Sequence, residues 1–99
     1  MKVLLVCAGG LSTSLLMTKM KSYWQEQNTE LDVEACSLAE YKDRFKDFEV
    51  VLVGPQISYR LDMIKDETKL PCGAINSTDY ALGRCDNIYR QLEELYQQR

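Results

Sequence analysis

The stretch KVLLVCAGGLSTSLL, residues 2–16, decides the fold class. Residues 2–7 form a continuous apolar run that ends near glycine, which is typical of a strand buried on both faces of a parallel sheet. Two glycines and three hydroxyl residues follow, and apolar side chains then recur at helical spacing. The chain therefore begins with a buried strand, a glycine-rich loop and a helix.

The same succession of strand and helix continues along the chain. Further strands are expected at residues 31–37, 48–54 and 70–75. Helices are expected from Ser12 to about Asn28, at 38–45 with Ser37 as the cap, at 57–68, and from Asp79 onward as one final helix. Alternating strands and helices imply parallel strands joined by right-handed crossovers. The predicted fold is α/β: a three-layer, doubly wound, four-stranded parallel sheet with strand order 2-1-3-4 and helices on both faces.

Length and composition indicate one soluble globular domain over residues 1–99. Hydrophobic residues make up 45% and charged residues 27% of the chain, which excludes a disordered protein. The net charge of −3 argues against sequence-independent binding of nucleic acid, which needs a basic face. The apolar runs are too short to span a bilayer, and the first leads into a helix with no cleavage site. We therefore expect a cytoplasmic protein.

The four cysteines and the lack of histidine limit the possible chemistry. Because no export signal is recognised, we expect free thiols in a reducing compartment. No two cysteines have C-x-x-C spacing and there is no histidine, so we expect no metal site; no cofactor is expected either. Without histidine the chain cannot perform Ser-His or Cys-His nucleophilic catalysis with its own residues.

Cys7 stands where the first predicted strand ends, and doubly wound sheets bind ligands beyond such carboxyl ends. Gly9 and Gly10 permit backbone N–H groups to converge on an anion. Ser12 or Thr13 can cap the following helix, whose N-terminus adds positive potential. This arrangement predicts a phosphate cradle and favours a thiolate at Cys7. The predicted phosphate-binding residues are Ala8, Gly9, Gly10, Leu11, Ser12, Thr13 and Ser14.

Several functions fit a cysteine at this place. Low-molecular-weight tyrosine phosphatases and related arsenate reductases have a nucleophilic cysteine there, followed by five residues, an arginine and a hydroxyl residue. Here Thr13 holds the arginine position, and no Asp-Pro general acid follows. An arginine there would bind two phosphate oxygens and stabilise the charge that develops during phosphoryl transfer. The pattern thus favours a phosphocysteine that is not hydrolysed, while a phosphatase or arsenate reductase remains an alternative.

Other α/β proteins fit less well. A receiver domain needs clustered acids after the first strand and an aspartate after the third, where this chain has Cys7 and Gly54-Pro55. A nucleotide binder would need a Walker lysine or G-x-G-x-x-G, and neither is present. A flavin-binding loop can be hydroxyl-rich, so a flavin binder stays an alternative. A regulatory module that binds a phosphorylated ligand without transfer stays open.

Three motifs resemble the lactose/cellobiose-type enzyme IIB proteins of the bacterial sugar phosphotransferase system. They are VCAGGLSTSLLMTKM at 6–20, VVLVGPQISY at 50–59 and, more loosely, INSTDYALG at 75–83. The resemblance spans nearly the whole chain in length and element order. Asn76 stands where the family often has aspartate, and Ala81 where glycine often follows the tyrosine.

The resemblance implies a function and its partners. Cys7 would accept a phosphoryl group from a histidine of enzyme IIA, which makes the chain a protein-N(π)-phosphohistidine–sugar phosphotransferase. Cys7 would then pass the group to a sugar held by the membrane component IIC. A β-linked disaccharide such as cellobiose, chitobiose or lactose is implied, and the subunit is expected to be a monomer in isolation. Partners carrying their own reactive groups would explain why this chain has no histidine.

The remaining candidates have structural interpretations. Cys36, Cys72 and Cys85 are expected to be packing residues. Met17, Met20, Tyr23 and Trp24 are expected to form the buried stripe of the first helix. Aromatic residues are enriched at interfaces, so a docking rim is expected at the same end of the sheet as Cys7. The rim residues are Gln56, Tyr59 and Tyr80.

Overall fold

The structure, a computed structural model, describes residues 1–7 and 11–98, and of residues 11 and 12 only the backbone. Its centre is a four-stranded, all-parallel sheet in the order β2-β1-β3-β4. The strands are β1 (Lys2–Val6), β2 (Asp32–Cys36), β3 (Val50–Val53) and β4 (Cys72–Ala74). The predicted fold class and strand order are confirmed, and β2 lies at one edge of the sheet.

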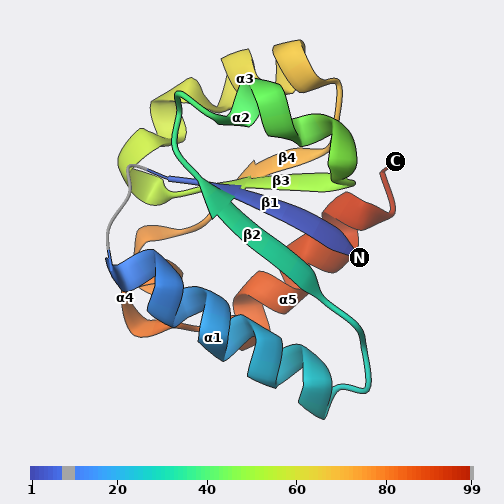
Figure 1. Ribbon diagram of the computed structural model, residues 1–99. Helices are drawn as coiled ribbons and strands as arrows, with labels where there is room; N and C mark the ends of the chain where they lie inside the picture. Colours follow the sequence, from blue (N-terminus) through green and yellow to red (C-terminus); the bar gives the residue numbers. More distant parts are fainter. Residues whose placement is uncertain (8–10, 99) are drawn as a thin grey trace.

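Helices cover both faces of this sheet (Figure 1). One layer comprises α1 (Leu11–Glu26), α4 (Ser77–Leu82) and α5 (Cys85–Tyr96). The opposite layer comprises α2 (Tyr41–Arg44), the 3-10 helices η1 (Phe45–Asp47) and η2 (Pro55–Arg60), and α3 (Leu61–Thr68). This is the three-layer arrangement expected of a doubly wound sheet.

Alternate residues of β1 enter two separate hydrophobic clusters. Val3 and Leu5 pack with α1 and α5, whereas Leu4 and Val6 pack with the layer on the other face. All four side chains are fully buried, and each stabilises the fold by roughly 1.5–3 kcal/mol relative to an exposed position. A continuous apolar run is therefore required here, because both faces of the strand are covered.

The predicted buried stripe of α1 is confirmed. Met20 and Trp24 are fully buried in the cluster between the sheet and the α1 and α5 layer. Met17 and Tyr23 are partly buried against the same cluster. Tyr23, Trp24 and Tyr89 of α5 form a group of edge-to-face and tilted ring contacts. These contacts attach α1 to α5 at the end of α1 distant from Cys7.

The prediction of one final helix from Asp79 onward was wrong. The segment forms two helices, because Gly83 adopts φ +64° and ends α4 in the left-handed conformation that glycine tolerates best. Arg84 then precedes α5. Ala81, in the last turn of α4, is exposed.

Two helix starts also differ from the prediction. Ser37 was expected to cap a helix at 38–45, but residues 38–40 form a turn and α2 begins at Tyr41. The Ser37 hydroxyl donates instead to the carboxylate of Glu40. Helical conformation was also expected from Ile57, but Ile57 has non-helical φ/ψ within η2, and the α-helix begins only at Leu61.

The four cysteines are free thiols and all are buried. Among residues 1–7 and 11–98, there is no group of three or more His, Cys, Asp or Glu side chains that could bind a metal ion. None of the helices among the described residues has both the length and the apolar content needed to cross a bilayer.

Alkaline pH is expected to destabilise this fold through two buried acids. Burial raises the pKa of Cys36 from 9.0 to about 11. The pKa of Tyr41 is raised from 10.0 to about 12, and burial is the largest cause of this shift. Both groups ionise earlier in the unfolded chain, so their contribution to stability is complete below about pH 9 and is lost as pH rises towards about 12.

Urea unfolding at several pH values between 8 and 12 measures this loss. We expect a smaller pH dependence for Cys36→Ala and for Tyr41→Phe than for the parent, since each variant removes one of the two ionisations. The same pH dependence in all three proteins would contradict the assignment.

Candidate active site

Cys7 lies at the carboxyl end of the central strand, between β2 and β3. Its backbone N–H donates to the carbonyl of Cys36 over 3.1 Å. On the other side, the N–H of Gly54 donates to the carbonyl of Val6 over 2.8 Å. The order of the strands reverses between β1 and β3, so Cys7 occupies the switch point at which doubly wound sheets bind ligands.

Two hydroxyl groups connect the Cys7 sulfur to distant parts of the chain. Thr13 Oγ1 lies 3.3 Å from Cys7 Sγ and donates to it. Thr13 Oγ1 also lies 2.9 Å from the hydroxyl of Tyr80 in α4. Cys7 and Thr13 are each only 3% exposed. The sulfur is therefore held from the first turn of α1, and that turn is held from α4.

A small cavity opens beside the sulfur, with a volume of about 210 Å³. It is lined by Cys7, Thr13, Ser14, Ala35, Cys36, Ser37 and Glu40. Three of these residues carry hydroxyl groups, and no lysine or arginine is among the described lining residues. An anion held here would meet hydroxyl and backbone donors.

Glu40 adds a negative charge to the wall of this cavity. Its carboxylate accepts hydrogen bonds from the backbone N–H and the hydroxyl of Ser37, at 3.2 and 3.0 Å. These bonds, the backbone one foremost, hold the pKa of Glu40 below its ordinary value. Glu40 is therefore a carboxylate at neutral pH, where it opposes a second anion and gives it no counter-charge.

A side chain at Gly54 would crowd Cys7. A Cβ at this position would lie 3.3 Å from the Cys7 Cβ and 3.1 Å from Gln56 Oε1. The glycine thus allows the third strand's end to approach the cysteine closely. This contact gives a physical reason for Gly54 in the stretch 50–59.

Residues 2–91 match the protein-family model of the lactose/cellobiose-specific IIB subunit of the phosphotransferase system (PTS). The chain belongs to this family. It is therefore a sugar-specific IIB component of such a system, and PTS IIB components are phosphotransferases. The family identified from the three motifs is confirmed.

Relatives and solved structures agree with this assignment. The chain is 33% identical to the oligo-beta-mannoside-specific EIIB component of Bacillus subtilis, over 91% of this chain and 90% of the relative. It is 28% identical to the galactose-specific EIIB component of Lactococcus lactis, over 94% of each chain.

Two solved IIB structures have the same fold. The cellobiose-specific IIB protein of Borrelia burgdorferi has a TM-score of 0.80 and 27% identity, over 99% of this chain and 93% of that one. The lactose-specific IIB domain of Streptococcus pneumoniae has a TM-score of 0.83 and 16% identity, over 97% of each chain.

The predicted phosphate loop of this IIB subunit is only partly described. Ala8, Gly9 and Gly10 lie outside the described residues, as do the side chains of Leu11 and Ser12. Ser14 is exposed and lines the cavity beside Cys7. Thr13 is buried and donates to the sulfur itself. Phosphate binding by these residues stays a prediction.

The three predicted rim residues have different surroundings. Tyr59 is 75% exposed and Gln56 is also exposed. Tyr80 is partly buried, and its hydroxyl bonds to Thr13. Sequence reasoning missed that bond. It also missed Cys36 and Glu40 as cavity residues, because no local pattern indicates which side chains of β2 and the following turn face Cys7.

Asn76 has a structural role at the start of α4. Its side-chain oxygen accepts from the N–H groups of Thr78 and Asp79, at 2.9 and 3.4 Å. Aspartate, which often stands here in the family, can form the same cap. The departure at Asn76 therefore preserves the helix start that carries Tyr80.

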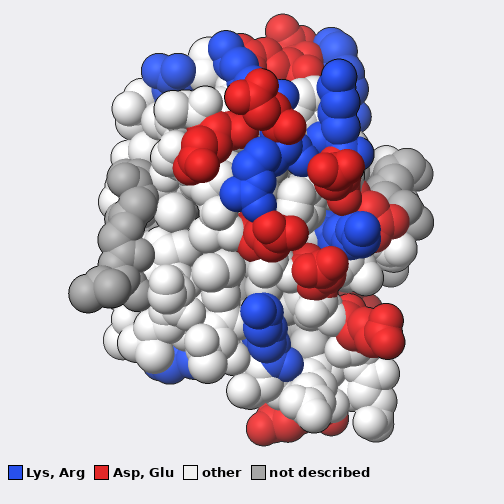
Figure 2. Space-filling model, viewed as in Figure 1, with Lys and Arg blue, Asp and Glu red and all other residues white. Residues whose placement is uncertain are grey.

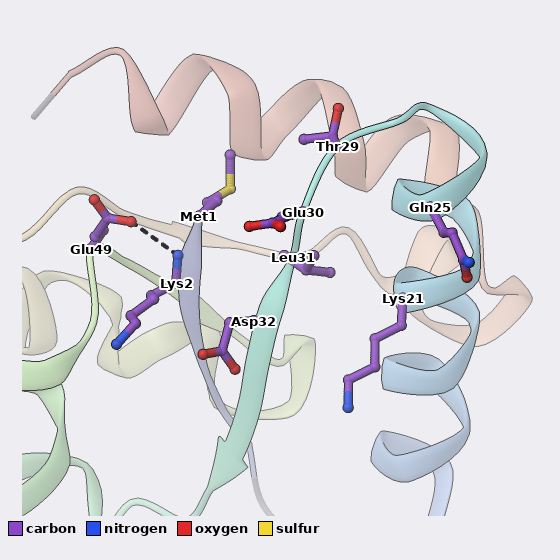
Figure 3. A pocket seen from close by; sticks show the side chains of 9 residues that line it. All are labelled: Met1, Lys2, Lys21, Gln25, Thr29, Glu30, Leu31, Asp32 and Glu49. Atoms are coloured by element: carbon purple, nitrogen blue, oxygen red, sulfur yellow. Dashed lines mark hydrogen bonds between the residues drawn. The ribbon is translucent and has the colours of Figure 1, made fainter.

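A larger cavity, of about 730 Å³, lies at the other end of the sheet, near the start of β1 and β2 (Figure 3). Its lining mixes acids and lysines, and the Lys2 backbone N–H donates to Glu49. Cys7, Thr13 and Tyr80 are not among the lining residues. The cavity is therefore separate from the cysteine site.

The cysteines are expected to differ in reactivity towards iodoacetamide at pH 7, with Cys7 modified first. Burial raises the pKa of Cys36 from 9.0 to about 11, and burial also raises the pKa values of Cys72 and Cys85. Two pKa units lower the thiolate fraction of Cys36 about a hundredfold at neutral pH.

Peptide mass mapping over time gives the order of labelling. We expect Cys7 to react at least about tenfold faster than each other thiol. Equal rates at all four positions would show that the Cys7 environment gives no selective activation.

Proposed function

We propose that Cys7 is the phosphoryl carrier of this IIB subunit. It accepts the group from a phosphohistidine of enzyme IIA and passes it to a sugar bound by the membrane component IIC. The observation that carries this proposal is the Cys7 sulfur, which accepts a hydroxyl hydrogen bond at the switch point of the sheet. A sulfur that accepts such a bond is oriented as a nucleophile.

The proposed reaction has two balanced steps. The Cys7 thiolate attacks phosphorus, an S–P bond forms, and the P–N bond breaks with its electron pair returning to the imidazole of the donor. The sugar hydroxyl then attacks phosphorus, an O–P bond forms, and the S–P pair returns to Cys7 as thiolate. A base at the sugar site takes the hydroxyl proton, since this chain has no histidine.

The surroundings of Cys7 favour carriage over hydrolysis. Hydrolytic enzymes stabilise the transferring group with a cation, whereas the described lining of this cavity contains the carboxylate of Glu40 and neither lysine nor arginine. Thr13, at the arginine position of the phosphatase pattern, is buried against the sulfur. Phosphocysteine would thus await a partner that brings its own nucleophile.

The surface near Cys7 favours contact with partner proteins. Among the described side chains, three large apolar ones are strongly exposed, at 60% for Leu15, 75% for Tyr59 and 58% for Leu82. They belong to α1, η2 and α4, which follow the carboxyl ends of β1, β3 and β4. In Figure 2 charged residues gather away from this end of the sheet, over the α2 and α3 layer. Exposed apolar side chains on elements that follow these strand ends suit repeated docking to IIA and IIC.

The proposed location and substrate follow from the transfer route. The subunit would act in the cytoplasm and meet IIC at the inner face of the membrane. The two named relatives are specific for oligo-beta-mannoside and galactose, and the Borrelia burgdorferi structure is of a cellobiose-specific IIB protein. We propose a β-linked disaccharide, such as cellobiose, chitobiose or lactose, as the acceptor.

Replacing the nucleophile should abolish transfer. Cys7→Ser is expected to fold normally and to lose phosphorylation by at least about a hundredfold, because a serine hydroxyl is far less ionised than a thiol. The measurement is intact-protein mass spectrometry after incubation with phosphorylated cognate IIA. Cys72→Ser is the matched control, because Cys72 is buried in β4 and does not line the Cys7 cavity.

A Cys7→Ser protein that relays phosphate to sugar at the parental rate would contradict the proposal. Steady turnover of p-nitrophenyl phosphate by the parent would favour a phosphatase. Binding of a phosphorylated ligand with no transfer from IIA would favour a regulatory module.

Crowding Cys7 from the neighbouring strand should slow transfer. Gly54→Ala would place a methyl group 3.3 Å from the Cys7 Cβ, which displaces the cysteine by a few tenths of an ångström. We expect roughly tenfold slower phosphorylation, since transfer depends closely on alignment. The rate of phosphorylation is measured by mixing each variant with phosphorylated IIA and quenching the reaction at successive times.

Gly73→Ala separates this effect from instability. Its methyl group would lie 2.9 Å from side-chain atoms of Gln91 and Leu95, which belong to α5. No atom of Cys7 is among the three atoms nearest to that methyl group. It should destabilise the fold, by about 1–3 kcal/mol for overpacking, with little change in the transfer rate. A similar loss of rate in both variants would contradict a local effect at Cys7.

A further inference from the structure

Tyr80 reaches the cysteine site from a distant part of the chain. Its hydroxyl lies 2.9 Å from Thr13 Oγ1, across 67 residues of sequence. The start of its helix is held by Asn76, which caps α4 two residues after β4. The sheet and a helix cap therefore help to place the Tyr80 hydroxyl beside Thr13.

The hydrogen bonds at Thr13 have a definite direction. A threonine hydroxyl has a single proton to donate. Thr13 gives that proton to Cys7 Sγ at 3.3 Å. The hydrogen bond between Thr13 and Tyr80 must then run from the Tyr80 hydroxyl to Thr13 Oγ1. The chain of donation is Tyr80 to Thr13 to the Cys7 sulfur.

We propose that Tyr80 is a positioning residue for Cys7, acting through Thr13. Its donated proton occupies an acceptor site on Thr13 Oγ1 and directs the single Thr13 proton onto the sulfur. A chain of such bonds strengthens each member, so the sulfur receives a stronger and better-aligned donor than Thr13 alone would supply. The importance of Tyr80 for phosphoryl transfer rests on the function proposed above. Its effect on Cys7 can be tested without any partner protein.

Loss of the Tyr80 hydroxyl has a definite consequence. In Tyr80→Phe the ring remains, while the Thr13 proton is free to turn to any nearby acceptor. The Cys7 thiolate then loses part of its stabilisation, and the reactivity of the thiol should shift to higher pH. Among the described residues, the other titratable groups around this cavity and its hydrogen bonds are Cys36 and Glu40, and both are unchanged in the variant.

The experiment measures the rate of Cys7 alkylation by iodoacetamide from pH 5 to pH 9, with peptide mass mapping. For Tyr80→Phe we expect roughly threefold to tenfold slower labelling at neutral pH, the range that one hydrogen bond supports. The rate at high pH should approach that of the parent. A merely structural effect would not move the pH profile in this way.

Tyr89→Phe is a matched control. The Tyr89 hydroxyl pairs with the Thr29 hydroxyl at 3.5 Å, so the same chemical group is removed from a tyrosine–threonine pair that does not involve Cys7. Its Cys7 labelling profile should equal that of the parent. Urea unfolding of both variants reports any difference in stability.

A double-mutant cycle tests whether Tyr80 acts through Thr13. Thr13→Val removes the donor to the sulfur, and adding Tyr80→Phe to it should slow labelling no further. Thr13→Ser keeps the hydroxyl, and in that background Tyr80→Phe should slow labelling as it does in the parent. Additive effects in the valine background, or equal profiles for Tyr80→Phe and Tyr89→Phe, would overturn the proposal.

Phosphorylation by IIA is then measured for the same variants. Slower transfer in Tyr80→Phe, in proportion to its slower labelling, supports the positioning role in the reaction. If the parent itself accepts no phosphate while the labelling cycle behaves as expected, the carrier function is wrong and the positioning of Cys7 by Tyr80 stands.

Discussion

The cysteine site depends on the backbone pairing that fixes the end of β1 between its two neighbours. The Cys7 N–H bonds to Cys36 and the Val6 carbonyl to Gly54, so both sides of the strand end are held. A slip in register by one residue would turn every side chain of β1 to the opposite face. Because both faces pack into hydrophobic clusters, the strand position, and with it the place of the thiol, is strongly specified.

Among the described residues, the side chains around the Cys7 sulfur supply a neutral donor and no cation. A buried hydroxyl donates to the sulfur, and the described cavity wall has a carboxylate but no basic side chain. Neutral donors orient a nucleophile without stabilising attack by water as an arginine would. In the proposed carrier role, a chain without histidine would rely on its partners for proton transfer. The site is therefore suited to holding a group between two encounters.

The strands were predicted well because their signal is local. Val3 to Val6 and Val50 to Val53 are continuous apolar runs, and burial on both faces allows few other sequences. The helix limits were predicted less well, since competing local interactions determine them. At Gly83 a left-handed residue ends α4, and at Ser37 the hydroxyl bonds to Glu40 instead of capping a helix.

Sequence alone determined the fold class, the strand order, the family and the thiol at the end of the first strand. Each of these is encoded in periodicity or in a short motif, which residues close together in the chain establish by themselves. Only the tertiary structure decided that Tyr80 bonds to Thr13, that Glu40 faces the cavity and that a side chain at Gly54 would crowd Cys7. These contacts join segments that follow different strands. They exist only because parallel strands bring their carboxyl ends to one edge of the sheet, and side-chain packing then selects which groups meet.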